Sequence, residues 1–153
     1  MHQRTTFSIV LAVLATSVAS AQDCKVSTDV TRISVSAGGV QKLAIDVGPA
    51  NAGLFFVLGS ASGTAPGFDL GLHYPLNVDH YLVDSWVGSL RLGAEGGIGF
   101  TDAAGKASFD LIVPPGSLSS FAGLTLHHAV APLSAATLLH TCVTNPVRLQ
   151  FVP

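Results

Sequence analysis

Histidine is the residue type with the most options for chemistry in this chain, because it can bind metals and transfer protons near neutral pH. His127 and His128 are adjacent in an alternating stretch, residues 124–131. Neighbouring residues of a strand point to opposite faces, so these two side chains cannot join one compact site without a bulge. The pattern therefore predicts that His128 is buried and bonded to backbone, and that His127 lies at the surface. A metal site formed by His127 and His140 from neighbouring strands is the alternative.

Motifs for nucleophilic and acid–base catalysis are incomplete. Residues 59–63 (GSASG) are close to a nucleophile elbow, but Ala61 stands where the serine is required. The Gly-Lys pair at 105–106 matches the end of a phosphate loop, but Ala107 replaces the hydroxyl residue that binds magnesium. Glu95 is the only glutamate and the aspartates are dispersed, so no converging pair of carboxylates is visible. We therefore predict no catalytic residues.

The long loop at residues 60–79 offers side chains suited to recognition, because loops carried on a rigid scaffold commonly make the contacts of binding proteins. Asn77 and Asp79 also carry oxygen atoms that could hold calcium, although turn formation accounts for the same residues. The predicted contact surface consists of Ser60, Ser62, Thr64, Phe68, Asp69, His73, Tyr74, Asn77 and Asp79.

Three aromatic residues, Tyr74, Tyr81 and Trp86, could form a platform for a sugar ring. Trp86 falls within an expected strand, residues 80–87, and this favours a position in the core. A carbohydrate- or calcium-binding module is thus the alternative function. No cofactor is expected.

The first 21 residues have the pattern of a cleavable secretory signal peptide. Arg4 supplies positive charge, residues 7–18 form an apolar run, and Ala-Ser-Ala at 19–21 supplies the small residues that a signal peptidase reads. The apolar run is shorter than the roughly 20 residues needed to span a membrane. We therefore expect residues 22–153 to form one mature domain that is exported to the periplasm, the cell surface or the medium.

The cysteine content fits an oxidising compartment. Cys24 and Cys142 are the only cysteines of the chain, and both lie in the expected mature domain. An even pair in an exported chain predicts one disulfide bond. Neither cysteine belongs to a CxxC motif, which argues against a zinc or redox site. Two free, buried cysteines are the alternative.

The charge pattern narrows the classes of partner. The formal net charge is −2, and the basic residues are scattered along the chain. Nucleic-acid binding requires clustered Lys and Arg, so we expect no nucleic-acid partner. The expected mature domain has no apolar stretch long enough to cross a membrane. The expected partner is a protein or a surface glycan.

Hydrophobic alternation, interrupted by Gly and Pro, predicts an all-β domain without an amphipathic helix. Residues 101–106 (TDAAGK) predict a hairpin turn, and residues 117–121 a single helical turn. The expected strands cover residues 31–36, 40–47, 53–59, 80–87, 107–113, 124–131, 136–144 and 147–152, with shorter ones at 70–74 and 96–100. We therefore predict a single antiparallel β-sandwich of about seven to nine strands, immunoglobulin-like in plan.

Five segments, taken in order, resemble an uncharacterised family of secreted bacterial β domains. They are residues 54–67 (LFFVLGSASGTAPG), 75–79 (PLNVD), 101–106 (TDAAGK), 123–129 (GLTLHHA) and 144–147 (TNPV). Such domains often form the last module of a larger exported protein. The resemblance implies export and a β fold, and it supplies no catalytic residues. The leading expectation is thus a secreted or cell-surface, non-enzymatic domain for binding or assembly, and an extracytoplasmic hydrolase ranks third.

Overall fold

The computed structural model describes residues 24–89, 92 and 96–153, so the expected signal peptide lies outside the described residues. The described part is rich in β-structure. Its elements are β1 (Lys25–Thr28), β2 (Arg32–Ser34), β3 (Gly39–Asp46), η1 (Pro49–Asn51), β4 (Leu54–Ser60), β5 (Phe68–Asp69), β6 (His73–Tyr74), α1 (His80–Trp86), β7 (Ile98–Phe100), β8 (Lys106–Val113), η2 (Ser119–Phe121), β9 (Thr125–Pro132) and β10 (Val147–Val152).

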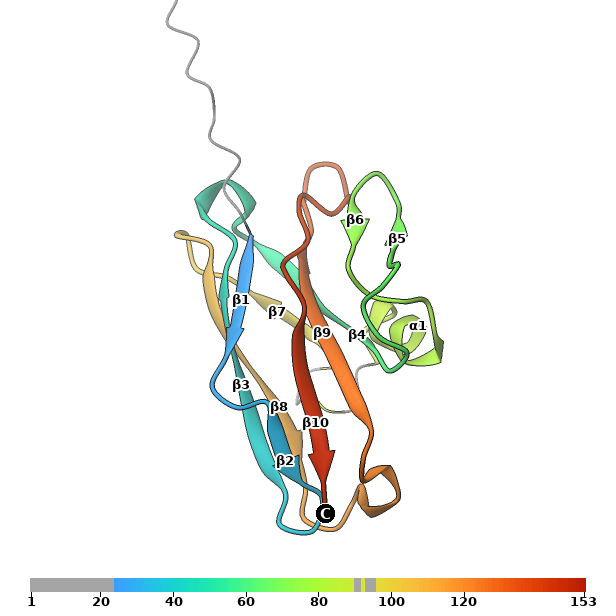
Figure 1. Cartoon of the computed structure of the whole chain (residues 1–153). Coiled ribbons are helices and arrows are strands. Elements are labelled where there is room, and N and C mark those ends of the chain that lie inside the picture. Colours follow the sequence, from blue (N-terminus) through green and yellow to red (C-terminus); the bar gives the residue numbers. More distant parts are fainter. Residues whose placement is uncertain (1–23, 90–91, 93–95) are drawn as a thin grey trace, which may run out of the picture.

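The strands form two main sheets and one small hairpin (Figure 1). One sheet has the order β1-β3-β8 and the other the order β2-β10-β9-β4-β7, while β5 pairs only with β6. Most neighbours are antiparallel, but β2 and β10 are parallel. The chain runs in the same direction in β1 and β2. Strand β10 also runs in this direction, so β2 and β10 pair in parallel (Figure 1). The prediction of a purely antiparallel, immunoglobulin-like sandwich is wrong in this respect, because the sheets are mixed.

The inner faces of the two main sheets share one hydrophobic core. Phe55 of β4 and Phe109 of β8 meet across it, with ring centroids 6.4 Å apart in an edge-to-face arrangement. Alternate residues of each strand point inward, as the period of two predicts. The fully buried members include Leu43, Val47, Val57, Leu111, Val130 and Leu149.

A second apolar cluster covers the outer face of the five-stranded sheet. Leu58 and Ala129 of the sheet pack there against Tyr74 of β6 and Leu82 of α1. Figure 1 shows the β5–β6 hairpin and α1 together on this side, away from β1, β3 and β8. Strand β4 is therefore buried on both faces, which accounts for its continuous run of apolar residues.

The expected strand at residues 80–87 is instead the helix α1. Asp79 caps its N-terminus, since its Oδ1 accepts a hydrogen bond of 2.8 Å from the backbone N–H of Leu82. The helix buries Leu82 and Ser85, three residues apart, and this spacing places both side chains on one face. Helical spacing and a capping residue thus override the alternation that predicted a strand.

The expected strand at residues 136–144 is also absent. Leu138 has a φ of 55°, which is incompatible with extended backbone, and its N–H donates to the carbonyl of Ser134 at 2.8 Å. The segment is a turn that returns to β9 through a single bridge between Leu133 and His140.

Residues 101–106 form the expected turn, but they do not join two paired strands. Asp102 Oδ1 accepts hydrogen bonds from the N–H groups of Ala104 and Lys106 at 2.9 and 2.8 Å. Gly105 has a φ of 77°, and an added Cβ there would lie 2.1 Å from the carbonyl oxygen of Gly48. Because β7 pairs with β4 and β8 with β3, the turn connects the two main sheets. The hairpin prediction is wrong for this reason.

Candidate functional site

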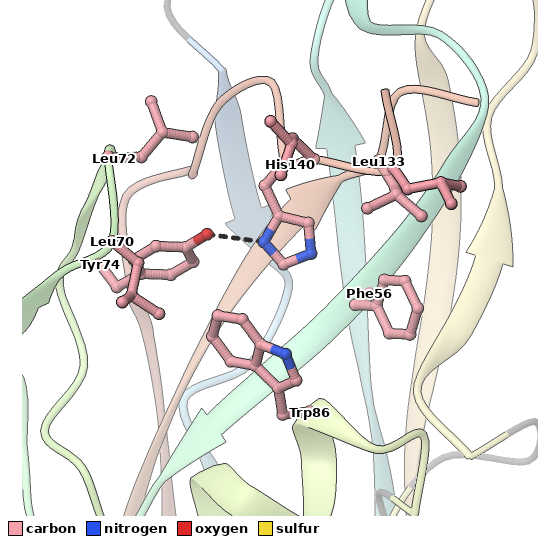
Figure 2. A pocket seen from close by; sticks show the side chains of 10 residues that line it. Phe56, Leu70, Leu72, Tyr74, Trp86, Leu133 and His140 are labelled. Atoms are coloured by element: carbon pink, nitrogen blue, oxygen red, sulfur yellow. Dashed lines mark hydrogen bonds between the residues drawn. The ribbon is translucent and has the colours of Figure 1, made fainter. Parts of the chain in front are cut away.

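The candidate site is an apolar pocket of about 490 Å³ on the outer side of the five-stranded sheet (Figure 2). Four segments form it: strand β4, the β5–β6 hairpin, the end of α1, and the turn that follows β9. Its lining consists of Phe56, Leu70, Gly71, Leu72, Tyr74, Trp86, Leu133, Leu138, Leu139 and His140. These described lining residues include no carboxylate, amine or thiol.

Aromatic rings make up the centre of the pocket. The ring centroid of Trp86 lies 5.2 Å from those of both Tyr74 and His140. The Phe56 ring lies 5.9 Å from that of His140, and Phe68 stacks on the far side of Tyr74 at 4.7 Å. Each ring is thus held by at least one other, so the pocket has a pre-formed aromatic wall.

Tyr74 and His140 are joined by a hydrogen bond of 2.7 Å between the phenol oxygen and Nδ1. Burial raises the pKa of Tyr74 and lowers the pKa of His140, so both side chains are neutral at pH 7. Figure 2 shows the second ring nitrogen of His140 and the indole nitrogen of Trp86 on the side away from Tyr74. The pocket therefore combines a large apolar surface with two polar atoms.

Exposed apolar side chains lie at the rim of the pocket and enlarge its apolar surface. Leu70, Leu138 and Leu139 are 65%, 73% and 67% exposed. A neighbouring hollow of about 300 Å³ shares Leu70 and Trp86 with the pocket and is otherwise lined by Phe68, Val78, Leu82, Val83 and Val87. We call the residues lining these two hollows the apolar face.

The apolar face gathers most of the exposed apolar side chains that the structure describes. Six of the eleven large ones lie on it: Leu70, Val78, Val83, Val87, Leu138 and Leu139. Scattered exposed apolar residues need no explanation, but a contiguous patch marks a site of interaction. This clustering distinguishes the apolar face from the rest of the described surface.

Asp79 organises the loop in which we predicted a contact surface. Its Oδ2 accepts hydrogen bonds from the hydroxyls of Ser60 and Ser62 and from the N–H groups of Ala61 and Ser62, at 2.8–2.9 Å. Burial alone raises the pKa of Asp79, but the hydrogen bonds, including the one from Leu82, outweigh burial and lower it to about 2. Asp79 is therefore ionised and fully occupied in holding the loop to α1.

The predicted contact residues divide into an internal and an external group. Ser60 and Tyr74 are buried. Asn77 is committed within the loop, since it accepts from the N–H of Gly67 at 3.1 Å and donates to the carbonyl of Ser62 at 3.0 Å. Thr64, Phe68 and Asp79 are half-buried, whereas Ser62, Asp69 and His73 are exposed.

The two adjacent histidines have different surroundings. His128 is completely buried, as the alternation predicts, and its Nε2 bonds to the hydroxyl of Tyr81 at 2.8 Å, where backbone was expected as the partner. Gly59 makes room for this contact, because a Cβ there would lie 2.3 Å from the Tyr81 ring. His127 is half-buried and does not lie at the open surface as expected.

The alternative metal pair, His127 and His140, is not brought together. His127 lies opposite Ser60 and Arg148 in the sheet, whereas His140 bridges Leu133. Leu133 lies six residues beyond His127, which corresponds to roughly 20 Å of extended chain. In the part of the chain that the structure describes, no group of three or more His, Cys, Asp or Glu residues could hold a metal ion.

Cys24 and Cys142 form a disulfide bond with their Cα atoms 6.4 Å apart, as predicted. The bond joins the start of the three-stranded sheet to the segment between β9 and β10. Such a bond fits an oxidising, extracytoplasmic environment.

Most of the apolar face does not follow from the sequence pattern. The pattern predicts strands at Phe56, Leu138, Leu139 and His140, and nothing in it indicates that these side chains surround Trp86. The one available signal was Asp79 followed by apolar residues at helical spacing, which is typical of a capped helix.

No family model matches this chain, and no curated protein matches it. None of the helices among the described residues has the length and apolar character needed to cross a membrane.

Proposed function

We propose that this chain is an exported, non-enzymatic binding protein that docks an apolar side chain of an extracellular partner on its apolar face. The observation that carries the proposal is the clustering of exposed Leu and Val side chains around a pre-formed aromatic pocket. Pockets that bind ligands are mostly apolar, with a few placed polar groups that fix orientation. The ring nitrogens of Trp86 and His140 match that description.

Binding accounts for the pocket better than catalysis does. A hydrolytic site needs a nucleophile or an activated water beside an acid or base. His140 is the one imidazole among the described residues of the pocket, burial lowers its pKa, and its Nδ1 is engaged by Tyr74. This arrangement supports the proposal that the pocket holds a partner without reacting with it.

A carbohydrate module is the second candidate, because Tyr74 and Trp86 lie together as a sugar platform requires. Tyr74, however, is 2% exposed and stacks on Phe68, so its faces are occupied. Sugar recognition also needs several hydrogen-bonding groups around the ring, and the pocket offers two ring nitrogens. An apolar side chain fits these surroundings better.

Export is part of the proposal. It is supported by the signal-peptide pattern of residues 1–21 and by the disulfide between Cys24 and Cys142. The resemblance to secreted bacterial β domains agrees with the same location.

The test compares two exposed apolar positions in peptide binding. Peptides selected on the protein from a random display library should contain an aliphatic or aromatic anchor. Leu139→Ser at the apolar face should weaken their binding by at least tenfold, because the loss of one buried leucine corresponds to about 1.5–3 kcal/mol. Phe100→Ser is the matched control, since Phe100 is 75% exposed and lies on β7, outside the apolar face.

Three results would contradict the proposal. Equal effects of Leu139→Ser and Phe100→Ser would mean that the peptides bind elsewhere. Binding of glycans that depends on Trp86 would favour the carbohydrate module. Turnover of ester, glycoside or peptide substrates that one substitution abolishes would identify an enzyme.

A further inference from the structure

We infer that the partner presents its apolar anchor beside lysine or arginine, so that the apolar face recognises a cationic apolar peptide segment. This inference rests on the proposed function and adds the charge of the partner. It follows from the distribution of charged side chains around the apolar face.

Basic residues are absent from the segments that form the apolar face. Residues 61–89 and 131–146 contain no Lys or Arg, but they contain three aspartates, Asp69, Asp79 and Asp84. The Lys and Arg residues that the structure describes all lie on strands of the two main sheets: Lys25, Arg32, Lys42, Lys106 and Arg148. The described segments that form the apolar face therefore carry aspartates and no lysine or arginine.

Two of these aspartates have carboxylates available to a partner. The side chain of Asp69 is 79% exposed, and one of its two oxygens contacts Nδ1 of His73 at 2.9 Å. Asp84 is exposed on α1, and no described residue forms an ion pair with it. Asp79 is the exception, because its hydrogen bonds to the loop occupy it.

Aspartates on the three-stranded sheet form ion pairs with lysines. Asp46 is paired with Lys106, and Asp110 is paired with Lys42. Lysines thus neutralise the aspartates Asp46 and Asp110 on that sheet. Beside the apolar face, neither Asp69 nor Asp84 has a lysine or arginine partner among the described residues. Complementary charges across an interface steer partners and set specificity.

Both available aspartates adjoin apolar residues that would make the contact. Asp69 directly precedes Leu70, which lines both hollows, and Asp84 directly follows Val83, which lines the smaller one. Each carboxylate thus lies one residue along the chain from an apolar side chain of the face, and we expect the residues that flank an anchor between the hairpin and α1 to reach it. Lysine or arginine at those positions gains an attraction, whereas glutamate meets repulsion.

The same charge distribution disfavours other occupants. A second copy docking through this face in a two-fold dimer would place the same surface, with its aspartates, on both sides of the interface. An anionic membrane surface would be repelled for the same reason. A basic, apolar segment of another protein satisfies both properties of the surface.

The test uses three acetylated and amidated peptides that share a Leu-Phe anchor and differ in the residues on either side, which are Lys, Ser or Glu. Each is titrated calorimetrically into the protein produced from the full chain, at low and at physiological salt. The lysine peptide should bind most tightly and the glutamate peptide least. Added salt should weaken binding of the lysine peptide and leave that of the serine peptide unchanged.

Charge variants assign the effect to this surface. Asp69→Asn combined with Asp84→Asn should weaken binding of the lysine peptide by roughly 3- to 10-fold, the range expected for two exposed ion pairs. The same double variant should leave binding of the serine peptide unchanged. Asp46→Asn combined with Asp110→Asn removes equal charge from the other sheet, and it should change binding of the lysine peptide by less than about twofold.

The outcomes separate this inference from the proposed function. If the three peptides bind equally and all depend on Leu139, the inference is overturned while the proposed function stands. Tighter binding of the glutamate peptide also overturns it. If no peptide binding depends on Leu139, the proposed function fails and the inference fails with it.

Discussion

At the scale of single residues, His128 is a titratable side chain enclosed in the five-stranded sheet. Burial lowers its pKa to about 3, with a smaller contribution from the neighbouring His127, whereas the ordinary value is 6.5. As the pH falls below 6.5 the unfolded chain binds a proton that the folded chain does not take up until about pH 3. Protonation of the unfolded chain therefore removes stability across this range.

We predict that the free energy of unfolding decreases between pH 6.5 and pH 3, with His128 contributing up to about 1.4 kcal/mol per pH unit. Denaturant melts at several pH values measure this slope. His128→Gln should flatten it, whatever its effect on stability at pH 7. A slope in His128→Gln equal to that of the unaltered protein would contradict the prediction.

At the scale of elements, Asp79 couples the loop at residues 60–79 to the helix α1. One carboxylate oxygen caps the helix and the other accepts from two serines and two backbone groups. Asp79→Asn removes the charge and an acceptor, and it should cost roughly 2–4 kcal/mol of stability. Because the pKa of Asp79 is lowered to about 2, its stabilising contribution is complete above pH 3.8 and is lost as the pH falls toward 2.

Chemical denaturation at pH 7 measures the effect of Asp79→Asn. Asp84→Asn is the matched control, because it removes the same charge from the exposed side of the same helix, and it should change stability by no more than about 0.5 kcal/mol. A loss of similar size in both variants would mean that the network at Asp79 contributes little.

The elements also show how far sequence reasoning reaches. Strands β3, β8, β9 and β10 follow from alternation, because each has one face on the shared core. The helix α1 was missed because seven residues span two turns, too few for a helical period to be distinguished from alternation. The other role of Asp79, holding the loop through Oδ2, depends on Ser60 and Ser62, which lie at and just beyond the end of β4 and which no local pattern brings to it.

The candidate site was harder to predict than the strands for a related reason. Tyr74 and Trp86 could be named as a pair of aromatic residues, but their contact with His140 depends on the turn at residues 133–140. Leu138 and Leu139 belong to a segment, residues 136–144, whose apolar pattern predicts a strand. Their exposure follows from the left-handed backbone at Leu138. Long-range contacts and one backbone angle determine which side chains form the apolar face, and the local sequence pattern indicates neither.

At the scale of the whole molecule, the disulfide between Cys24 and Cys142 closes a loop with a sequence separation of 118 residues. Cross-linking so long a loop restricts the unfolded chain, and removal of such a bond commonly costs about 2–5 kcal/mol. We expect Cys24→Ala combined with Cys142→Ala to lose stability in this range, measured by denaturant melts.

Reduction of the unaltered protein provides the control for this variant. A reducing agent should lower the stability of the unaltered protein to that of the double variant, and leave the variant itself unchanged. The intact mass before reduction should be two hydrogens below that of the dithiol form. Alkylation of both thiols in denatured, unreduced protein would contradict the bond.

The same covalent bond determines how the molecule responds to a mechanical pull. The start of β1, which Cys24 directly precedes, and the C-terminus lie toward opposite ends of the molecule (Figure 1). A force applied between Cys24 and Pro153 passes through the disulfide to Cys142, so the eleven residues that follow, 153 − 142, are the part that can be stretched. At about 3.4 Å per residue they extend to roughly 40 Å. Strand β10, held between β2 and β9, carries the load, while the apolar face lies inside the cross-linked loop and is shielded from tension.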